Sequence, residues 1–273
     1  MMDINIIEKI KQTIKDADAI LITSGAGLGV DSGLPDFRGN EGFWKAYPPI
    51  KKLGLSFQEM ANPIWFTNNP ALAWAFYGHR LNLYRETIPH DGFKMLLDLV
   101  KQKNDNYFIF TSNVDGQFQK AGFNKDKIYE VHGSIHHLQC SNTCSKDIWE
   151  NDEDIEVDMD KFEAIDIPLC PKCRDIARPN ILMFGDWGWN GRRASNQEQR
   201  YMKWRKQNRL KNIAIIEIGA GSAIPTVRVE GDHLAKYQKT AKLIRINPRD
   251  FKVNPNTSFS IPLGGLDGIK EII

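Results

Sequence analysis

The sequence lacks any apolar run that approaches the ~20 residues of a membrane-spanning helix, and it lacks a strong excess of charge of either sign. Its formal net charge is only +2, which gives no sign of nucleic acid or a membrane surface as a partner. Residues 1–17 have the pattern of an amphipathic helix and lack the apolar centre and cleavage site of a signal peptide. We therefore expect a cytoplasmic protein with no membrane or nucleic-acid partner.

Cysteine is scarce as well, with four residues in 273. Thiols stay reduced in the cytoplasm, so four cysteines there favour a metal over disulfides. They form two close pairs, one spaced C-x₃-C and one spaced C-x₂-C: Cys140, Cys144, Cys170 and Cys173. Four thiolates complete the tetrahedral shell of Zn²⁺ and leave no open position, so we expect a structural zinc site. Four unrelated buried thiols are the alternative.

Short apolar runs alternate with helical patterns along most of the chain. The runs indicate buried strands at residues 19–23, 107–110, 180–184, 214–218 and 243–246. Helical periodicity marks residues 70–85, 93–100 and 186–211. This alternation predicts an α/β fold, a Rossmann-like parallel sheet with helices on both faces.

A glycine-rich loop follows the first expected strand, where residues 25–39 read GAGLGVDSGLPDFRG. Backbone N–H groups in such a loop can approach a phosphate closely. Val30 stands where the standard dinucleotide fingerprint has its last glycine, so the glycines alone fit a tight strand-to-helix turn equally well.

The whole segment resembles the NAD-binding loop of sirtuins, which reads GAG-x-S-x-x-SGIPDFRG. Further sirtuin-like motifs follow in the family's order: TSNVD at 111–115, VHGS at 131–134, RPNILMFGD at 178–186 and Ile-Asn at 246–247. The resemblance runs from residue 25 to residue 247. It implies an enzyme that uses NAD as co-substrate to remove acyl groups from protein lysine, giving nicotinamide and O-acyl-ADP-ribose.

The resemblance also implies site residues. His132 would be the general base, a role that suits an imidazole with an ordinary pKa near ~6.5. Asn113 would orient ribose and water. The implied contacts with NAD are Gly25, Ala26, Gly27, Asp36, Phe37, Arg38, Ser112, Asn113, Asp115, Gly219, Ser222 and Asn247.

The sequence departs from the sirtuin pattern at two of these places. Ser112 stands where the family has glutamine and is too short to span the same gap to the ribose. Residues 219–222 read GAGS where the family has Gly-Thr-Ser, so hydroxyl groups are missing. Both changes would weaken NAD binding while leaving the base intact.

The resemblance divides the chain into two domains. A Rossmann-like NAD-binding domain would comprise residues 1–42, 87–135 and 178–273. A small domain would combine a helical module at 43–86 with a zinc-binding module at 136–177.

Tyr77 and Arg80 lie three residues apart on the expected helix 70–85 and therefore share a face. The pair resembles the Tyr-x-x-Arg of sirtuins that remove succinyl, malonyl and glutaryl groups. A guanidinium can bind a terminal carboxylate bidentately, so the pair predicts acidic acyl substrates. The alternative is an amphipathic helix with Tyr77 inside and Arg80 in water.

The sequence departs most from the family after residue 186, where Trp187 and Trp189 flank a glycine ahead of a basic helical stretch at 197–211. Two interpretations of this tryptophan segment are open: an aromatic floor for a ligand, or a packed hairpin. Two other functions also remain open: NAD glycohydrolysis or ADP-ribosyl transfer, and non-catalytic sensing of NAD or ADP-ribose.

Overall fold

The computed structural model describes residues 4–35 and 39–273. Its main sheet has the strand order β11-β10-β9-β1-β2-β3, and every neighbouring pair is parallel. The strands are β1 (Ala19–Ser24), β2 (Tyr107–Thr111), β3 (Ile128–Glu130), β9 (Ile213–Ile218), β10 (Ala241–Ile246) and β11 (Ser258–Ile261). All residues of β1, β2 and β9 are buried, which explains why these strands appear as continuous apolar runs.

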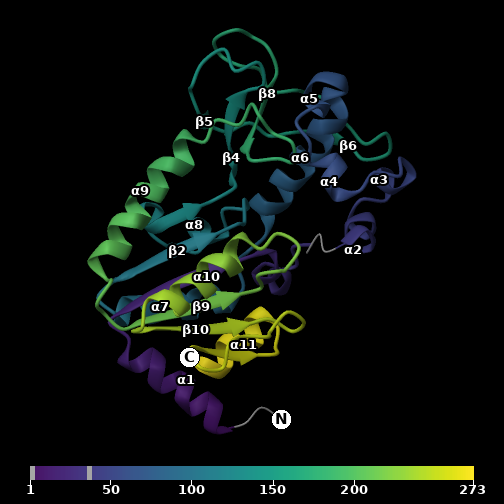
Figure 1. Cartoon of the computed structure of the whole chain (residues 1–273). Helices are drawn as coiled ribbons and strands as arrows, with labels where there is room; N and C mark the ends of the chain where they lie inside the picture. The colour runs from purple at the N-terminus through teal and green to yellow at the C-terminus, as the bar shows by residue number, and fades with distance from the viewer. Residues whose placement is uncertain (1–3, 36–38) are drawn as a thin grey trace.

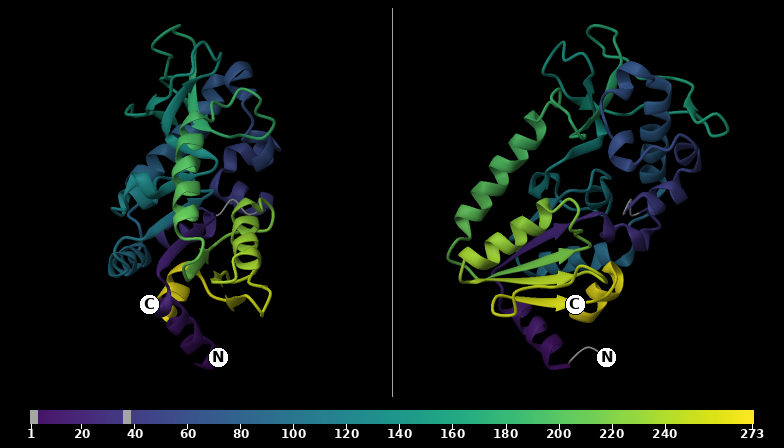
Figure 2. Two further views of the ribbon diagram at one scale, coloured as in Figure 1. Left: turned by 60° about the vertical axis from the view of Figure 1, so that its left-hand side comes forward. Right: turned by 45° about the vertical axis from the view of Figure 1, so that its right-hand side comes forward.

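Helices cover both faces of this sheet, as predicted, because successive strand residues point to opposite faces. Ile20 and Ile22 of β1 face a cluster with α1 (Ile4–Asp16), α7 (Asp91–Gln102), α8 (Gln117–Lys120) and α11 (Gly265–Ile272). Ala19 and Leu21 face α9 (Arg192–Gln207) and α10 (Thr226–Tyr237). The two layers can be followed in Figure 1 and, turned, in Figure 2.

A second hydrophobic cluster lies above the sheet in Figure 1. Its helices are α2 (Gly39–Ala46), α3 (Pro48–Lys52), α4 (Phe57–Met60), α5 (Trp65–Asn68) and α6 (Pro70–Glu86). Its strands are β4 (Gly133–Cys140), β5 (Trp149–Glu150), β6 (Val157–Asp158), β7 (Glu163–Ala164) and β8 (Ala177–Ile181). Trp74 and Phe76 of α6 pack with Ile135 and Leu138 of β4, so this part has a core of its own.

Two predicted boundaries are wrong near residue 186. The strand expected at 180–184 is β8, which ends at Ile181, and the helix expected from 186 begins at Arg192. Asp186 causes the difference. Its buried carboxylate pairs with Arg178 at 2.8 Å and accepts the backbone N–H groups of Met183 (3.3 Å) and Gly188 (3.1 Å). The ion pair therefore folds residues 183–188 into a turn.

Within the part of the chain that the structure describes, every helix is too short or too polar to cross a bilayer.

Candidate functional site

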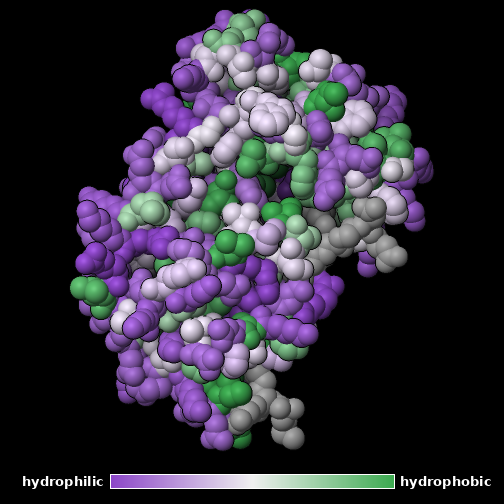
Figure 3. Space-filling view, viewed as in Figure 1, coloured by the Kyte–Doolittle hydropathy of each residue, from purple (hydrophilic) through white to green (hydrophobic). Residues whose placement is uncertain are grey.

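A cavity of about 630 Å³ opens at the carboxyl ends of the main-sheet strands, the edge at which parallel sheets bind ligands. On the face shown in Figure 3 the molecule is hollowed between the sheet and the helical part. The wall brings together most of the predicted site residues: Gly25, Ala26, Tyr77, Arg80, Ser112, Asn113, Asp115, His132, Gly219 and Ser222. Gly27 and Asn247 are not among the described lining residues. Asp36, Phe37 and Arg38 lie outside the described residues.

The glycine loop after β1 packs backbone to backbone against the loop after β9. The N–H of Gly27 donates to the carbonyl of Gly219 at 3.1 Å. A Cβ on Gly219, whose φ is 64°, would lie 2.5 Å from the Cα of Gly27, and a Cβ on Gly25 would lie 2.9 Å from the Cα of Ala220. Neither position can accept a side chain. The glycines therefore leave backbone groups as the main surface at this end of the cavity.

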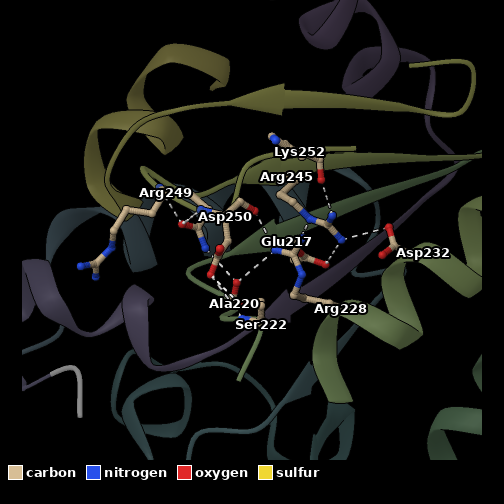
Figure 4. Close-up of polar contacts among 10 residues, drawn as sticks. Glu217, Ala220, Ser222, Arg228, Asp232, Arg245, Arg249, Asp250 and Lys252 are labelled. Atoms are coloured by element: carbon tan, nitrogen blue, oxygen red, sulfur yellow. Dashed lines mark hydrogen bonds and ion pairs between the residues drawn. The ribbon is translucent and has the colours of Figure 1, made fainter. Parts of the chain in front are cut away.

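Asn247 and Asp250 join the loops after β9 and β10. Figure 4 shows Asp250 beside Ser222. Asn247 is buried, and its amide donates to the Ala220 carbonyl at 2.8 Å while its oxygen accepts the N–H of Asp250 at 2.9 Å. The Asp250 carboxylate accepts both the N–H and the hydroxyl of Ser222, each at 3.3 Å. Asn247 thus stabilises the wall of the cavity through its bonds to Ala220 and Asp250. Its contact with NAD stays a prediction. Asp250, which lines the cavity, was missed from the sequence.

An ion network centred on the buried Arg245 and Glu217 lies beside these loops (Figure 4). Arg245 contacts both carboxylate oxygens of Glu217, at 2.5 and 3.1 Å, and one of Asp232 at 3.0 Å. Arg228 donates to the Asp250 carbonyl at 2.7 Å. Bidentate geometry fixes the angle between charged groups as well as their distance, so the network fixes the ends of β9 and β10 beside the cavity.

His132 lies just beyond β3, with its carbonyl accepting the N–H of Leu182 at 2.9 Å. Burial lowers the pKa of its imidazole, although a hydrogen bond with the backbone of Ser112 partly opposes this effect. A lowered pKa keeps the ring neutral near pH 7, the form that accepts a proton. The short side chain of Ser112 donates to the Ser24 carbonyl at 3.5 Å.

Asp115 is a buried carboxylate in the wall of the same cavity. It accepts the N–H of Gln117 at 3.0 Å. Burial raises its pKa from 3.8 to about 6, and the negative charge of Glu130 adds to the effect. A raised pKa means that the folded protein prefers the protonated acid. Its contribution to stability is therefore present at low pH and is lost as the pH rises from about 4 to about 6.

Asp115→Asn should stabilise the fold above pH 7, because it removes a buried charge and keeps an oxygen for Gln117. The difference between 3.8 and about 6 corresponds to roughly 3 kcal/mol, which sets an upper limit on the gain. Urea unfolding at pH 8 and pH 4 would measure it. The gain in the free energy of unfolding should disappear at pH 4. An equal gain at pH 8 and pH 4 would contradict burial of the Asp115 charge as its cause.

Tyr77 and Arg80 both face the cavity from α6. Arg80 is buried, so the alternative that placed it in water is wrong. Its guanidinium donates to the Tyr84 hydroxyl from Nε (3.2 Å) and Nη2 (2.9 Å) and lies over the ring of Phe76 at 5.1 Å. Burial raises the pKa of Tyr77, which keeps its phenol a hydrogen-bond donor. Tyr84, four residues after Arg80, is a partner that the predicted pair did not include.

The sulfur atoms of the four cysteines all lie within 4.8 Å of one another. The Cys140–Cys173 and Cys144–Cys170 separations are 3.6 and 3.5 Å. Zn–S bonds of about 2.3 Å in a tetrahedron place sulfurs roughly 3.8 Å apart, so these thiols fit Zn²⁺. Cys140 ends β4 and the second pair precedes β8, so an ion bound here would tie the two strands together.

The chain resembles proteins of one family throughout its length. Residues 25–202 match the model described as the Sir2 family. An NAD-dependent protein deacylase 1 of Caldanaerobacter subterraneus is 31% identical over 185 residues, which cover 68% of this chain and 67% of that protein. An NAD-dependent protein deacylase of Thermus thermophilus is 23% identical over 98% of this chain and 94% of its own.

The fold agrees with the sequence match. A solved Sir2 homolog–NAD complex superimposes with a TM-score of 0.73 at 24% identity, over 100% of this chain and 93% of that one. A Sir2 homologue in complex with ADP-ribose gives the same TM-score over 97% and 94% of the two chains. The resemblance inferred from the motifs is thus confirmed, and the chain belongs to the Sir2 family.

Proposed function

We propose that this chain is an NAD-dependent protein-lysine deacylase that favours acyl groups ending in a carboxylate. One observation carries the proposal: a single cavity holds the glycine loops at one end, His132 in its wall and the buried Arg80 beside it. The relatives named NAD-dependent protein deacylases support the reaction class. The acyl preference rests on Arg80 and its neighbours alone.

NAD would supply the electrophilic C1′ of its nicotinamide ribose, to which the acyl oxygen adds as nicotinamide leaves. The backbone of the loops at Gly25 and Gly219 fits the phosphate half of such a ligand. His132, neutral in its buried position, would take the proton from the ribose hydroxyl that attacks the acyl carbon. Asp115 would accept the carboxamide N–H of nicotinamide.

The lowered pKa of His132 predicts the pH dependence of turnover. Protonation removes the base, so kcat should fall as the pH drops through a value below the ordinary ~6.5 of histidine. Turnover should therefore be constant from pH 7 to pH 8. Measuring kcat from pH 5 to pH 9 at saturating NAD and peptide would test this. An acidic limb centred above pH 7 would be inconsistent with a buried, neutral imidazole.

A terminal carboxylate fits the end of the cavity at Arg80. The guanidinium is held in place by Tyr84 and by aromatic rings, so it is already oriented when an acyl chain enters. Hydrogen bonds between ionised groups contribute about 1.5–3 kcal/mol each when partly buried. An acetyl group has no oxygen that reaches beyond the amide carbonyl and gains nothing from Arg80.

Arg80→Met should lower kcat/KM for a succinyl-lysine peptide by roughly 10–100-fold, from the loss of one charged hydrogen bond or more. Deacetylation by the same variant should change by less than about 3-fold, since ~0.6 kcal/mol is near the scatter of unrelated effects. Arg80→Lys keeps the charge but not the planar donor pair. Its kcat/KM for the succinyl-lysine peptide should therefore lie between the values for Arg80→Met and the wild type. An unchanged ratio of the two activities would remove the basis for acidic acyl groups.

The alternative functions differ in whether nicotinamide is released and whether its release requires an acylated peptide. A glycohydrolase would release nicotinamide without any acylated peptide, and a sensor would release none. Neither Trp187 nor Trp189 is among the described residues that line the cavity, so the tryptophan segment gives the glycohydrolase no support.

A further inference from the structure

A second and larger cavity, of about 1050 Å³, lies beside the first and shares Tyr84 and Asp115 with it. Its walls include β4, the β5 edge of the small sheet, α8 and the amino-terminal half of α9. These elements meet at the upper end of α9 in Figure 1. The reaction proposed above makes no use of this space. Its volume lies just above the range typical of small-molecule sites, about 300–1,000 Å³.

The first turn of α9 lacks the acidic residues that usually lie at the amino end of a helix. Gly191 precedes it without a side-chain cap, no acid lies in the first turn, and Arg192 and Arg193 occupy its first two positions. The amino end of a helix carries partial positive charge, so cations there are unfavourable and an anion is favourable. Glu130 compensates Arg193 at 2.5 Å, whereas no ion pair to Arg192 exists among the residues with described coordinates. Departures of this kind are expected at binding sites.

Three polar side chains in the wall have buried atoms without a hydrogen-bond partner. Asn151 is 2% exposed, and its Oδ1 has none. The same is true of Nη1 of Arg193 and Nδ1 of His137. All three residues line the cavity. Buried polar atoms are nearly always paired in folded proteins, so three unpaired atoms in one wall are a departure that calls for a further polar partner.

Charge is divided between the two sides of the cavity. Lys125, Lys146 and Arg200 add positive charge to that of Arg192. Two of the acids in the wall already have cationic partners, since Asp147 pairs with Lys172 at 2.5 Å and Asp126 lies 3.8 Å from Arg200. Glu150 and Asp152 remain on the β5 side, one on each side of Asn151 in the chain. An anionic group therefore fits at α9, and hydroxyl or amino donors fit at β5.

We propose that this cavity binds a phosphorylated small molecule that carries hydroxyl or amino groups. Its phosphate lies at the start of α9 against Arg192, and its donors face Asn151. Phosphate suits the helix end because the helix dipole favours a compact anion there. The N–H of Arg192 already donates to Asn190 Oδ1 at 3.3 Å, so the anion would be bound mainly by the dipole and the guanidinium of Arg192.

The site is positioned to act on the first cavity through His136. Its Nε2 lies 2.9 Å from the carbonyl of Asp115, and a Cβ on Gly116 would lie 2.7 Å from the same ring. The loop that carries Asp115 therefore rests on a side chain that lines the second cavity. A ligand there contacts His136, Gly116 and Asp115, so its binding and that of nicotinamide should be coupled in both directions.

Calorimetric titration with ribose 5-phosphate tests the proposal, with inorganic phosphate as a second probe and saturating ADP-ribose present to fill the first cavity. We expect ribose 5-phosphate to bind in the presence of ADP-ribose, and more tightly than phosphate alone. Arg192→Glu combined with Lys146→Glu should weaken it at least 10-fold. Lys203→Glu, on the exposed face of α9 outside the cavity, is the matched control and should bind as the wild type does.

The Arg192→Glu change separates binding from folding, because an acid at the start of α9 suits the helix dipole. The thermal midpoint of the variant should equal or exceed that of the wild type. No binding of either probe by the wild type would overturn the proposal. Equal affinity in the double variant, or binding abolished by ADP-ribose, would also overturn it, and all three results are independent of deacylase activity.

Discussion

His132→Ala is expected to lower kcat for deacylation by about 10²–10⁴-fold, the usual contribution of a positioned general base. Among the described residues that line the first cavity, His132 is the one histidine. Asp115, with a pKa raised to about 6, is the neighbouring carboxylate, but the N–H of Gln117 engages it. Mass spectrometry of O-acyl-ADP-ribose would measure the loss directly.

Two controls separate loss of the base from loss of the site. The affinity for ADP-ribose should stay within about 3-fold of wild type, because alanine removes no group that the glycine loops use. His233→Ala changes an exposed histidine on α10 whose ring lies tilted against that of Tyr237, and it should keep full activity. Turnover by His132→Ala within 10-fold of wild type would mean that another group takes the proton.

Loss of the metal is the second large effect that we expect. In small zinc domains the apparent free energy of zinc binding is about 10–16 kcal/mol, comparable to the whole stability of a domain, about 5–15 kcal/mol. Cys170→Ser should therefore unfold the part built on β4 and β8 and lower the thermal midpoint sharply. Elemental analysis should find one zinc per chain in the wild type and none in the variant.

The matched control for this change is Asn142→Ala, which alters an exposed residue of the turn between Cys140 and Cys144 without removing a thiol. Its midpoint should match the wild type. A strong chelator should reproduce the effect of Cys170→Ser. Zinc-free protein that unfolds at the wild-type temperature would show that the four thiols do not require a metal.

The sequence predicted those features that depend on residues close together along the chain. Residues 19–23 form most of β1, because an uninterrupted apolar run is buried on both faces of a parallel sheet. The two cysteines of each pair are close because of their spacing along the chain, and the pairing of β4 with β8 then brings the two pairs together. The glycine loop was recognised through its motif, and the structure adds the reason that Gly25 and Gly219 accept no side chain.

The sequence did not predict features that depend on contacts between residues that are not neighbours along the chain. Nothing local shows that Asp186 bonds Arg178 and turns the chain away from a helix. The burial of Arg80 depends on packing among α6 and its neighbours and does not follow from its spacing to Tyr77. Asp250 contacts Ser222 across the loops after β10 and β9, and His136 of β4 contacts the Asp115 carbonyl in the loop after β2.

Nicotinamide release from NAD tests the central claim most directly, measured with a succinyl-lysine peptide, with an acetyl-lysine peptide and without peptide. The account predicts release that depends on peptide, is faster with the succinyl group, and is accompanied by O-acyl-ADP-ribose. Release at the same rate without peptide, or no release under any of the three conditions, would contradict it.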